Sequence, residues 1–338
     1  MELGQASNLW YNYSMSYEPP FIITARSINL ISEISEKLGM LTAYSEDPLH
    51  VELRRANRIK TIHSSLAIEN NSLSIEQITA IIEGKRVLGA PDEIQEVKNA
   101  VQAYDLLLGL NPYEEKDLLR AHRLMMSDLV KRNGKYRSGG VGIFDGKEIV
   151  HVAPPADRVP LLMADLFGWL KTSKQHPLIK SCVFHYEFEF IHPFEDGNGR
   201  MGRLWQTVIL KDWKKIFAWL PVETMIKEHQ SDYYEALNVS DTSADSTAFI
   251  EFMLDLFRNA IDESIKAQES KKVTAKVTVN QKKIMQAIKK NPHITQEELS
   301  EKVGIAVKNI KENMKKMQEQ NLIRRVGADK NGHWEVVG

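Results

Sequence analysis

Twelve consecutive residues, from His192 to Arg203, combine a histidine, an aspartate, two arginines and a Gly-Asn-Gly tripeptide. Glycine permits the backbone angles that aim successive N–H groups at one cluster of oxygen atoms. Two arginines three residues apart share a helix face and can each hold a phosphate group through paired hydrogen bonds. Asp196 offers an oxygen ligand for a magnesium ion carried by phosphates, and His192 can take a proton near neutral pH. These residue types predict chemistry on a phosphate-bearing ligand.

The flanking segments indicate where this stretch lies. Apolar residues recur at helical spacing over 178–190 and over 204–210, so the polar residues form a loop that runs into the start of a helix. Backbone N–H groups at a helix start lack helical acceptors, and the helix dipole favours an anion there. A capped helix start with solvated charges is the alternative interpretation. The complete spacing of histidine, aspartate, glycines and arginines favours a functional loop.

Written in full, the stretch is His-Pro-Phe-Glu-Asp-Gly-Asn-Gly-Arg-Met-Gly-Arg. It resembles the Fic family signature, HxFx(D/E)GNGRxxR, at every specified position. Residues 134–137 (Gly-Lys-Tyr-Arg), 151–155 (His-Val-Ala-Pro-Pro) and 233–237 (Tyr-Tyr-Glu-Ala-Leu) also resemble segments that flank the signature in this family. The resemblance covers about residues 20 to 265.

The resemblance implies an adenylyltransferase that moves AMP from ATP to a Ser, Thr or Tyr hydroxyl of a target protein or of itself. In this reading His192 is the general base, Asp196 holds Mg²⁺ or Mn²⁺, and Phe194 anchors the loop in the core beside the nucleotide. Five further residues would bind the phosphates of ATP, namely Gly197, Asn198, Gly199, Arg200 and Arg203. Tyr233 and Tyr234 are candidate nucleoside contacts, although aromatic residues on helices are commonly core residues.

A second motif, Ser65-Leu-Ala-Ile-Glu69-Asn70, resembles the family's inhibitory pattern (S/T)xxxE(G/N). Its position before the signature implies the class with an N-terminal inhibitory helix. Glu69 could pair with Arg203, take the space of the ATP γ-phosphate and spoil in-line attack at the α-phosphate. A solvated glutamate at a helix end is the alternative. Because a carboxylate near a metal-bound phosphodiester can activate water, Glu69 could also support removal of AMP from a modified protein.

Residues 138–152 interrupt the helical pattern, with Asp145-Gly146 between two short apolar runs, which predicts a β-hairpin. The family resemblance makes this hairpin a flap to which a target protein adds a strand, around residues 141–152. A plain surface hairpin is the alternative.

The remaining pattern predicts a mainly α protein, a Fic-type helical bundle with a β-hairpin flap and a small C-terminal winged helix-turn-helix domain. Helical spacing or caps place helices over 24–38, 51–66, 91–108 and 116–130, and a capping box at Ser74 opens another that ends near Gly84. The expected domains are an N-terminal helical region with the inhibitory motif, the catalytic core, a polar linker and the winged helix, at 1–110, 111–266, 267–278 and 279–338.

In the C-terminal part, helices are expected over 280–290, over 296–303 after a capping box at Thr295, and over 307–320. Apolar strands at 322–326 and 334–337 complete a winged helix. The third helix and the wing carry basic residues that could neutralise nucleic-acid phosphates, Lys308, Lys311, Lys315, Lys316, Arg324 and Arg325. Many winged helices bind proteins instead, so DNA or a protein is the expected partner.

The whole chain of 338 residues has a net charge of −1, but residues 274–338 hold 13 basic and 7 acidic residues. This asymmetry suggests an acidic partner for the C-terminal part. A single cysteine, Cys182, excludes an intramolecular disulfide. With neither a long apolar run nor a signal-peptide pattern, we expect a cytoplasmic enzyme without membrane contact, which could form a homodimer. A nucleotide-sensing DNA-binding regulator is the alternative function.

Overall fold

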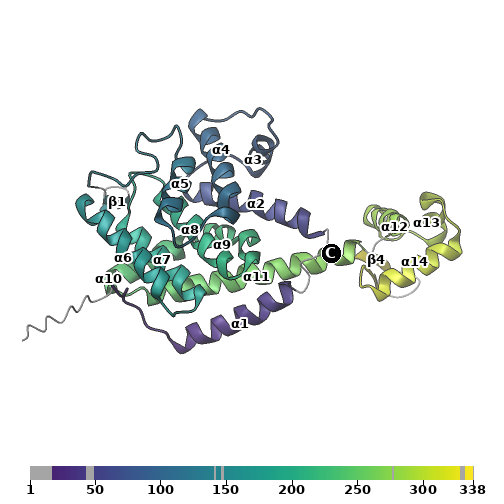
Figure 1. Ribbon diagram of the computed structural model, residues 1–338. Coiled ribbons are helices and arrows are strands. Elements are labelled where there is room, and N and C mark those ends of the chain that lie inside the picture. The colour runs from purple at the N-terminus through teal and green to yellow at the C-terminus, as the bar shows by residue number, and fades with distance from the viewer. Residues whose placement is uncertain are drawn as a thin grey trace, which may run out of the picture. The chain divides into compact units, whose positions relative to one another are not determined.

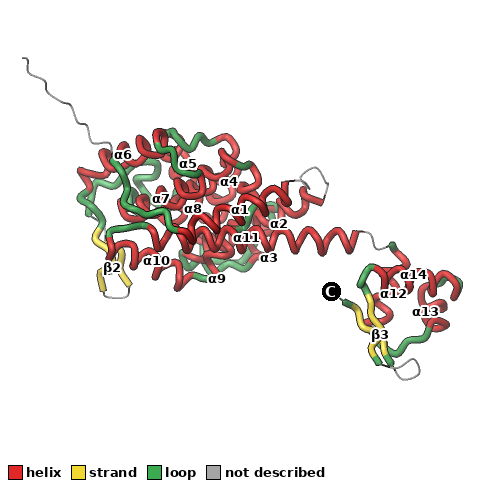
Figure 2. Tube along the Cα trace, turned by 90° about the horizontal axis from the view of Figure 1, so that it is seen from below, coloured by secondary structure: helices red, strands yellow, loops and turns green. Residues whose placement is uncertain are grey.

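The computed structural model describes residues 17–42, 49–140, 142–145, 148–275, 278–327 and 332–337. Most of these residues are helical, and the strands form two separate antiparallel pairs (Figure 2). The chain divides into two compact units, Met1–Ile261 and Asp262–Gly338. The mainly α fold class predicted from the sequence is confirmed.

The larger unit is a helical bundle (Figure 1). Its helices are α1 (Ala25–Thr42), α2 (Leu49–Ile68), α3 (Ile75–Ile82), α4 (Pro91–Leu106), α5 (Glu115–Met125), α6 (Val159–Thr172), α7 (Pro177–Ile191), α8 (Asn198–Trp213), α9 (Val222–Glu228), α10 (Gln230–Ser243) and α11 (Thr247–Ala275), the last of which ends in the second unit. Short 3-10 helices lie at Leu107–Gly109, Ala156–Arg158 and Lys215–Trp219.

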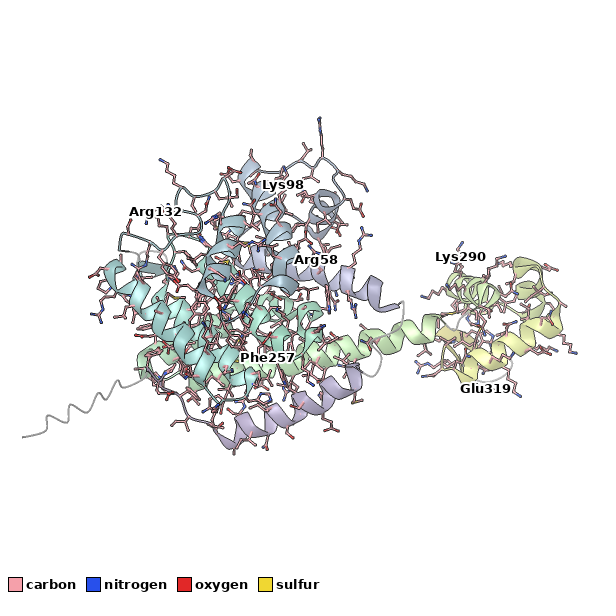
Figure 3. The ribbon with its side chains drawn as sticks, in the orientation of Figure 1. Arg58, Lys98, Arg132, Phe257, Lys290 and Glu319 are labelled. Carbon is pink, nitrogen blue, oxygen red and sulfur yellow. The ribbon has the colours of Figure 1, made fainter. Side chains whose placement is uncertain are left out.

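Helices α7 and α8 pack against each other in the middle of this unit (Figure 1). Most side chains of both helices are buried, and these include polar ones such as His185 of α7 and Arg203 of α8. Large aromatic side chains fill the core around them, including Phe184, Trp205 and Phe257, of which Figure 3 labels the last. The loop between α7 and α8 is therefore held at both ends by largely buried helices.

The predicted hairpin consists of β1 (Gly142–Asp145) and β2 (Glu148–Val152), which pair antiparallel. The register shifts between Ile143 and Phe144, which marks a bulge or a similar irregularity in the pairing. The predicted turn residue Gly146 lies outside the described residues.

The second unit has the predicted winged-helix order. Helices α12 (Val279–Lys290), α13 (Gln296–Val303) and α14 (Val307–Glu319) precede the strands β3 (Ile323–Val326) and β4 (His333–Val336). Capping boxes at Thr278 and Thr295 start the first two helices. One apolar cluster forms the core, with contributions from all three helices and from β3.

Several predicted boundaries differ from the structure, including the end of α1, which lies at Thr42 rather than at 38. Helix α5 ends at Met125 rather than near 130, because the chain turns there and Asp128 adopts a left-handed backbone (φ 60°). The expected linker over 267–278 is helical as far as Ala275, where α11 ends. Its alanines, its lysines and its one glutamate are strong helix formers, but the segment has no apolar stripe from which a helix could be predicted. None of the helices in the described ranges is both long and apolar enough to cross a membrane.

Candidate active site

The loop between α7 and α8 uses left-handed backbone at both of its ends. His192 ends α7 with φ 48° and ψ 61°, and Gly197 precedes α8 with φ 82°. Only glycine adopts this conformation without cost, so the strained His192 is held there by its surroundings. A Cβ atom added to Gly197 would lie 2.6 Å from Sδ of Met126. Glycine is therefore required at 197 for its backbone angles and for its small size.

Side chains buried in the core fix the middle of the loop. The Asn198 amide accepts a hydrogen bond from the backbone N of Phe194 and donates one to its O, each at 2.9 Å. The Phe194 ring is fully buried and stacks on the imidazole of His122, with ring centroids 3.6 Å apart. The structure thus places Phe194 and the side chain of Asn198 in the support of the loop.

His122 is a supporting residue that the sequence did not reveal. Its Nδ1 accepts a hydrogen bond from the backbone N of Gly134 (2.8 Å), so Nε2 carries the proton and donates to the carbonyl oxygen of Asp196 (3.0 Å). Burial lowers the pKa of His122 to about 4, which keeps the ring neutral. In the sequence, His122 is one polar residue on the buried face of a helix. Nothing in that pattern indicates a supporting role.

Arg137 ties the base of the hairpin to the loop. Its Nε donates to the carbonyl oxygen of His192 (2.8 Å), and its Nη2 donates to those of Pro154 (2.5 Å) and Ile191 (3.2 Å). Pro154 lies two residues beyond β2, so one buried guanidinium joins the hairpin to the left-handed histidine. The segment 134–137 was noticed in the sequence, but the contacts of Arg137 were not foreseen.

The first turn of α8 can bind an anion. The amide of Met201 is bonded to the carbonyl oxygen of Gly197 (2.9 Å), so the helix itself offers no acceptor to the amides of residues 198–200. The Arg200 side chain is used in other contacts. It is 3% exposed and pairs with Glu96 of α4 (2.9 Å) and with Oδ1 of Asp196 (3.2 Å). Its contacts orient Asp196, whose side chain is 57% exposed.

The carboxylate of Glu69 lies against this anion-binding end. Its Oε1 is 2.8 Å from Nη2 of Arg203, and a Cβ atom added to Gly199 would lie 2.5 Å from the same oxygen. Arg203 is 2% exposed and also donates to Oγ and to the carbonyl oxygen of Ser65, at 3.2 and 2.9 Å. Burial acts to lower the pKa of Arg203, but the Glu69 carboxylate, together with Tyr233 and Glu189, outweighs it and the pKa is raised.

Local backbone chemistry presents Glu69 at this place. Asn70 adopts a left-handed backbone (φ 67°), its N donates to Ala67 O (3.2 Å), and the N of Asn71 donates to Leu66 O (3.1 Å). These bonds form a Schellman motif that ends α2, with Glu69 as its C-cap. Asparagine is the residue other than glycine that tolerates this conformation best, so Asn70 acts through its backbone.

The known relatives of the chain agree with this geometry. Residues 112–210 match the model of the Fic/DOC family, and residues 278–324 match a family described as winged helix-turn-helix DNA-binding. The crystal structure of a Fic family protein from Desulfovibrio desulfuricans G20 is 47% identical, with a TM-score of 0.72, over 95% of this chain and 99% of that one. The chain belongs to the Fic family.

More distant Fic relatives carry a functional name. "Protein adenylyltransferase Fic" from Culex quinquefasciatus is 29% identical over 63% of this chain, and the Aedes aegypti protein of the same name is 28% identical over 68%. The chain spans less than half the length of these two relatives, 43% and 46%. A Fic-domain signaling protein from Bacteroides thetaiotaomicron VPI-5482 shares the fold, with a TM-score of 0.60 at 18% identity over 73% of this chain and 97% of that one.

The two tyrosines proposed as nucleoside contacts differ in this Fic structure. Tyr233 is 2% exposed, and its hydroxyl meets Nε2 of His185 at 3.1 Å. Burial lowers the pKa of His185 to about 3, so this pair is a neutral part of the core. Tyr234 is 48% exposed, and its pKa is raised by burial first and by the Glu69 carboxylate second. The geometry therefore favours Tyr234 over Tyr233 as a residue that could contact a nucleoside.

A second buried carboxyl lies near Arg203. Glu223 of α9 is 2% exposed, and its Oε1 accepts a hydrogen bond from the hydroxyl of Tyr104 (3.0 Å). Burial raises the pKa of Glu223 to about 7, and the charge of Arg203 only partly opposes this. Nothing in the sequence separates Glu223 from solvated glutamates on helices, so this residue was missed.

The Fic family implies a divalent metal bound together with the nucleotide. Among the described residues, no group of three or more His, Cys, Asp or Glu side chains is arranged to hold a metal ion. Magnesium seldom needs such a cage, because it binds through one or two carboxylates, substrate phosphates and water. The exposed Asp196 beside the anion-binding turn fits this mode of binding.

Proposed function

We propose that this chain is a protein adenylyltransferase that its own Glu69 holds in a restrained state. One observation carries the proposal, namely that the Glu69 carboxylate lies on both Arg203 and the Gly199 turn of α8. An anion at a helix start, paired with a buried arginine, stands where a terminal phosphate of a nucleotide would bind. The names of the relatives supply the reaction class.

The reaction joins a target hydroxyl to the α-phosphorus of ATP and breaks the bond to the β-phosphate oxygen, so pyrophosphate leaves. His192 takes the hydroxyl proton. The amides of residues 198–200 and Arg203 hold the outer phosphates, and Asp196 would hold Mg²⁺ or Mn²⁺, which would neutralise phosphate charge. Catalysis of this kind depends mainly on positioning, so the fixed loop that carries His192 is the principal contribution of the protein.

Glu69 restrains this reaction by occupying Arg203. ATP can still bind through its base and sugar, while its outer phosphates are kept from Arg203 and its α-phosphorus is turned from the line of attack. The Glu69 side chain is 32% exposed, so it can leave without unfolding the core. The same exposure lets it contact water, which favours removal of AMP from a modified protein as a second candidate activity.

The target protein is expected to pair with the hairpin, whose strands β1 and β2 pair only with each other among the described strands. Arg137 joins Pro154, just beyond β2, to His192 through backbone carbonyls. A target strand bound at this hairpin would therefore be held in a defined relation to the catalytic histidine. A hydroxyl side chain on such a strand needs no further sequence-specific contact.

The winged helix provides a site for a further partner, DNA or a protein. Lys308, Lys311 and Lys315 are exposed on α14 and support contact with phosphates. The wing offers fewer contacts to phosphates than the sequence suggested. Arg324 pairs with Glu335 (2.5 Å), and Arg325 stacks on Trp334 (5.0 Å). Binding through the helix, with the wing in a supporting role, is the arrangement that these contacts favour.

The proposal is tested by incubating three forms with α-labelled ATP and magnesium and measuring intact mass, namely the native chain, Glu69→Gly and Glu69→Gly/His192→Ala. We expect Glu69→Gly to gain the mass of one AMP, since the protein can serve as its own target. Loss of His192 should reduce the rate by about 10²–10⁴-fold without changing the melting temperature. If none of the three forms gains mass while all bind ATP, the chain is not a transferase of this kind.

A further inference from the structure

The last turn of α2 requires hydrogen-bond donors from outside the helix. Four carbonyl groups at any helix end lack helical partners, and a basic residue in the last turn commonly compensates. Helix α2 has no basic residue in its last turn. Donors from elsewhere nevertheless reach all four carbonyls: Ser65 O from Arg203 (2.9 Å), Leu66 O from the amide of Asn71 (3.1 Å), Ala67 O from Nζ of Lys227 (2.9 Å) and Ile68 O from Nε2 of Gln230 (3.2 Å).

Lys227 and Gln230 form one unit at this helix end. Nζ of Lys227 donates hydrogen bonds to Ala67 O and to Oε1 of Gln230. The distance from Nζ to this Oε1 is 2.8 Å. Gln230 is thereby oriented so that its amide nitrogen faces Ile68 O. Both residues are partly buried, and they lie at the end of α9 and the start of α10. The positive charge of Lys227 also interacts favourably with the negative end of the α2 dipole.

We propose that Lys227 and Gln230 are positioning residues that hold Glu69 in its restraining place, an inference that rests on the proposed function of Glu69. The two residues bind backbone carbonyls of Ala67 and Ile68, directly before Glu69 in the chain. An incoming phosphate competes with Glu69 for Arg203, but it has no competing interaction with these carbonyls. Lys227 and Gln230 therefore keep the end of α2 in place after the Glu69–Arg203 pair has opened, so that Glu69 can return and compete with ATP for Arg203.

The arrangement also defines a route for activation. A ligand, modification or partner that draws the α9–α10 junction away from α2 would remove one cation and one amide from its last turn. The carbonyl of Ile68 would lose its side-chain donor, that of Ala67 would keep only the amide of Asn70, and the helix end would fray. Glu69 would then leave Arg203 without any change in the catalytic loop.

The test substitutes Lys227→Met, which keeps the length of the side chain and removes its donor. A charge-assisted hydrogen bond of this kind is lost, so transfer should rise about tenfold in the native background. In the Glu69→Gly background the same substitution should leave transfer unchanged, because no restraint remains. Lys211→Met is the matched control, since Lys211 Nζ also binds a backbone carbonyl, Leu110 O at 2.7 Å, but does so away from α2.

A second measurement separates this inference from the proposed function. Hydrogen exchange of the amides at residues 66–71 should become faster in Lys227→Met and in Gln230→Leu, and stay native in Lys211→Met and in Lys227→Arg. If Glu69→Gly raises transfer but Lys227→Met changes neither transfer nor exchange, the positioning role is wrong and the restraint by Glu69 stands. If exchange rises while Glu69→Gly itself has no effect on transfer, the helix-end contacts stand and the restraint fails. Equal gains in both backgrounds would show that Lys227 acts on catalysis and would overturn the inference.

Discussion

Two helices of this protein end in the same way and with different consequences. Glu69 caps α2 before left-handed Asn70, and Glu83 caps α3 before left-handed Gly84. The hydrogen bonds of the two Schellman motifs correspond, since Lys85 N donates to Ala80 O as Asn71 N donates to Leu66 O. Each glutamate then pairs with one arginine, and Glu83 pairs with Lys85 as well (2.7 Å). The backbone is therefore equivalent at the two ends.

The arginines distinguish the two ends. The side chains of Glu69 and Glu83 are 32% and 33% exposed, whereas Arg203 is 2% exposed and Arg55 is 64% exposed. A surface ion pair such as Glu83–Arg55 contributes little to stability, because water and salt screen it. Removing one partner of a buried pair is far more disruptive, because it leaves an uncompensated charge. In the proposed function, the burial of its arginine partner is what makes the capping Glu69 a regulatory group.

The largest expected effect is on stability. It comes from Glu223, a buried carboxyl near Arg203, whereas Arg55 lies at the surface. The pKa of Glu223 is raised to about 7 in the folded protein, above its ordinary 4.5. Its contribution to stability is present below pH 4.5 and is lost as pH rises toward 7, on the order of 3 kcal/mol for a shift of this size. Glu223→Gln should therefore flatten the fall of melting temperature between pH 4.5 and 7. Thermal denaturation across this range checks the prediction, and an unchanged slope would remove Glu223 as its cause.

The next effect compares the two capping glutamates directly. We expect Glu69→Gly to raise AMP transfer by about one to two orders of magnitude, the size of a few kcal/mol of equilibrium bias. Glu83→Gly removes a cap of the same geometry and should leave transfer at the native rate. Initial rates with α-labelled ATP measure both. Equal gains in the two variants would mean that loosening any helix end activates the protein, and the distinction drawn between the arginines would fail.

The smallest effect concerns the left-handed residues themselves. Asn70→Gly should stabilise the protein by up to about 1 kcal/mol, because glycine adopts this conformation without steric cost. Gly84→Asn should destabilise it by a similar or smaller amount. Denaturant unfolding of both variants provides the values. A large change in transfer from Asn70→Gly would show that the Asn70 side chain has a role that its backbone position does not explain.

Sequence reasoning reached the parts of the site that lie close together in the chain. The spacing from His192 to Arg203 predicted a loop at a helix start, and the structure has that loop between α7 and α8. The pairing of Glu69 with Arg203 came from a family pattern, and their side chains meet at 2.8 Å. The roles of these residues in transfer and restraint stay predictions.

The supporting residues could not be found in this way. His122, Arg137 and Lys227 act mainly on backbone carbonyls of segments that lie far from them in sequence. A carbonyl group is present at every position and leaves no mark in the sequence, so only the fold shows which one is met. The burial of Tyr233 against His185 could not be predicted either, because it depends on how the helices pack.

The most direct test of the account compares binding of ATP and of AMP to the native chain, Glu69→Gly and Glu83→Gly by calorimetry in the presence of magnesium. If Glu69 stands where a terminal phosphate binds, Glu69→Gly should strengthen ATP binding by about tenfold and leave AMP binding unchanged. Glu83→Gly should match the native chain for both ligands. An equal change for ATP and AMP in Glu69→Gly, or no change for either, would contradict competition between Glu69 and the terminal phosphate for Arg203.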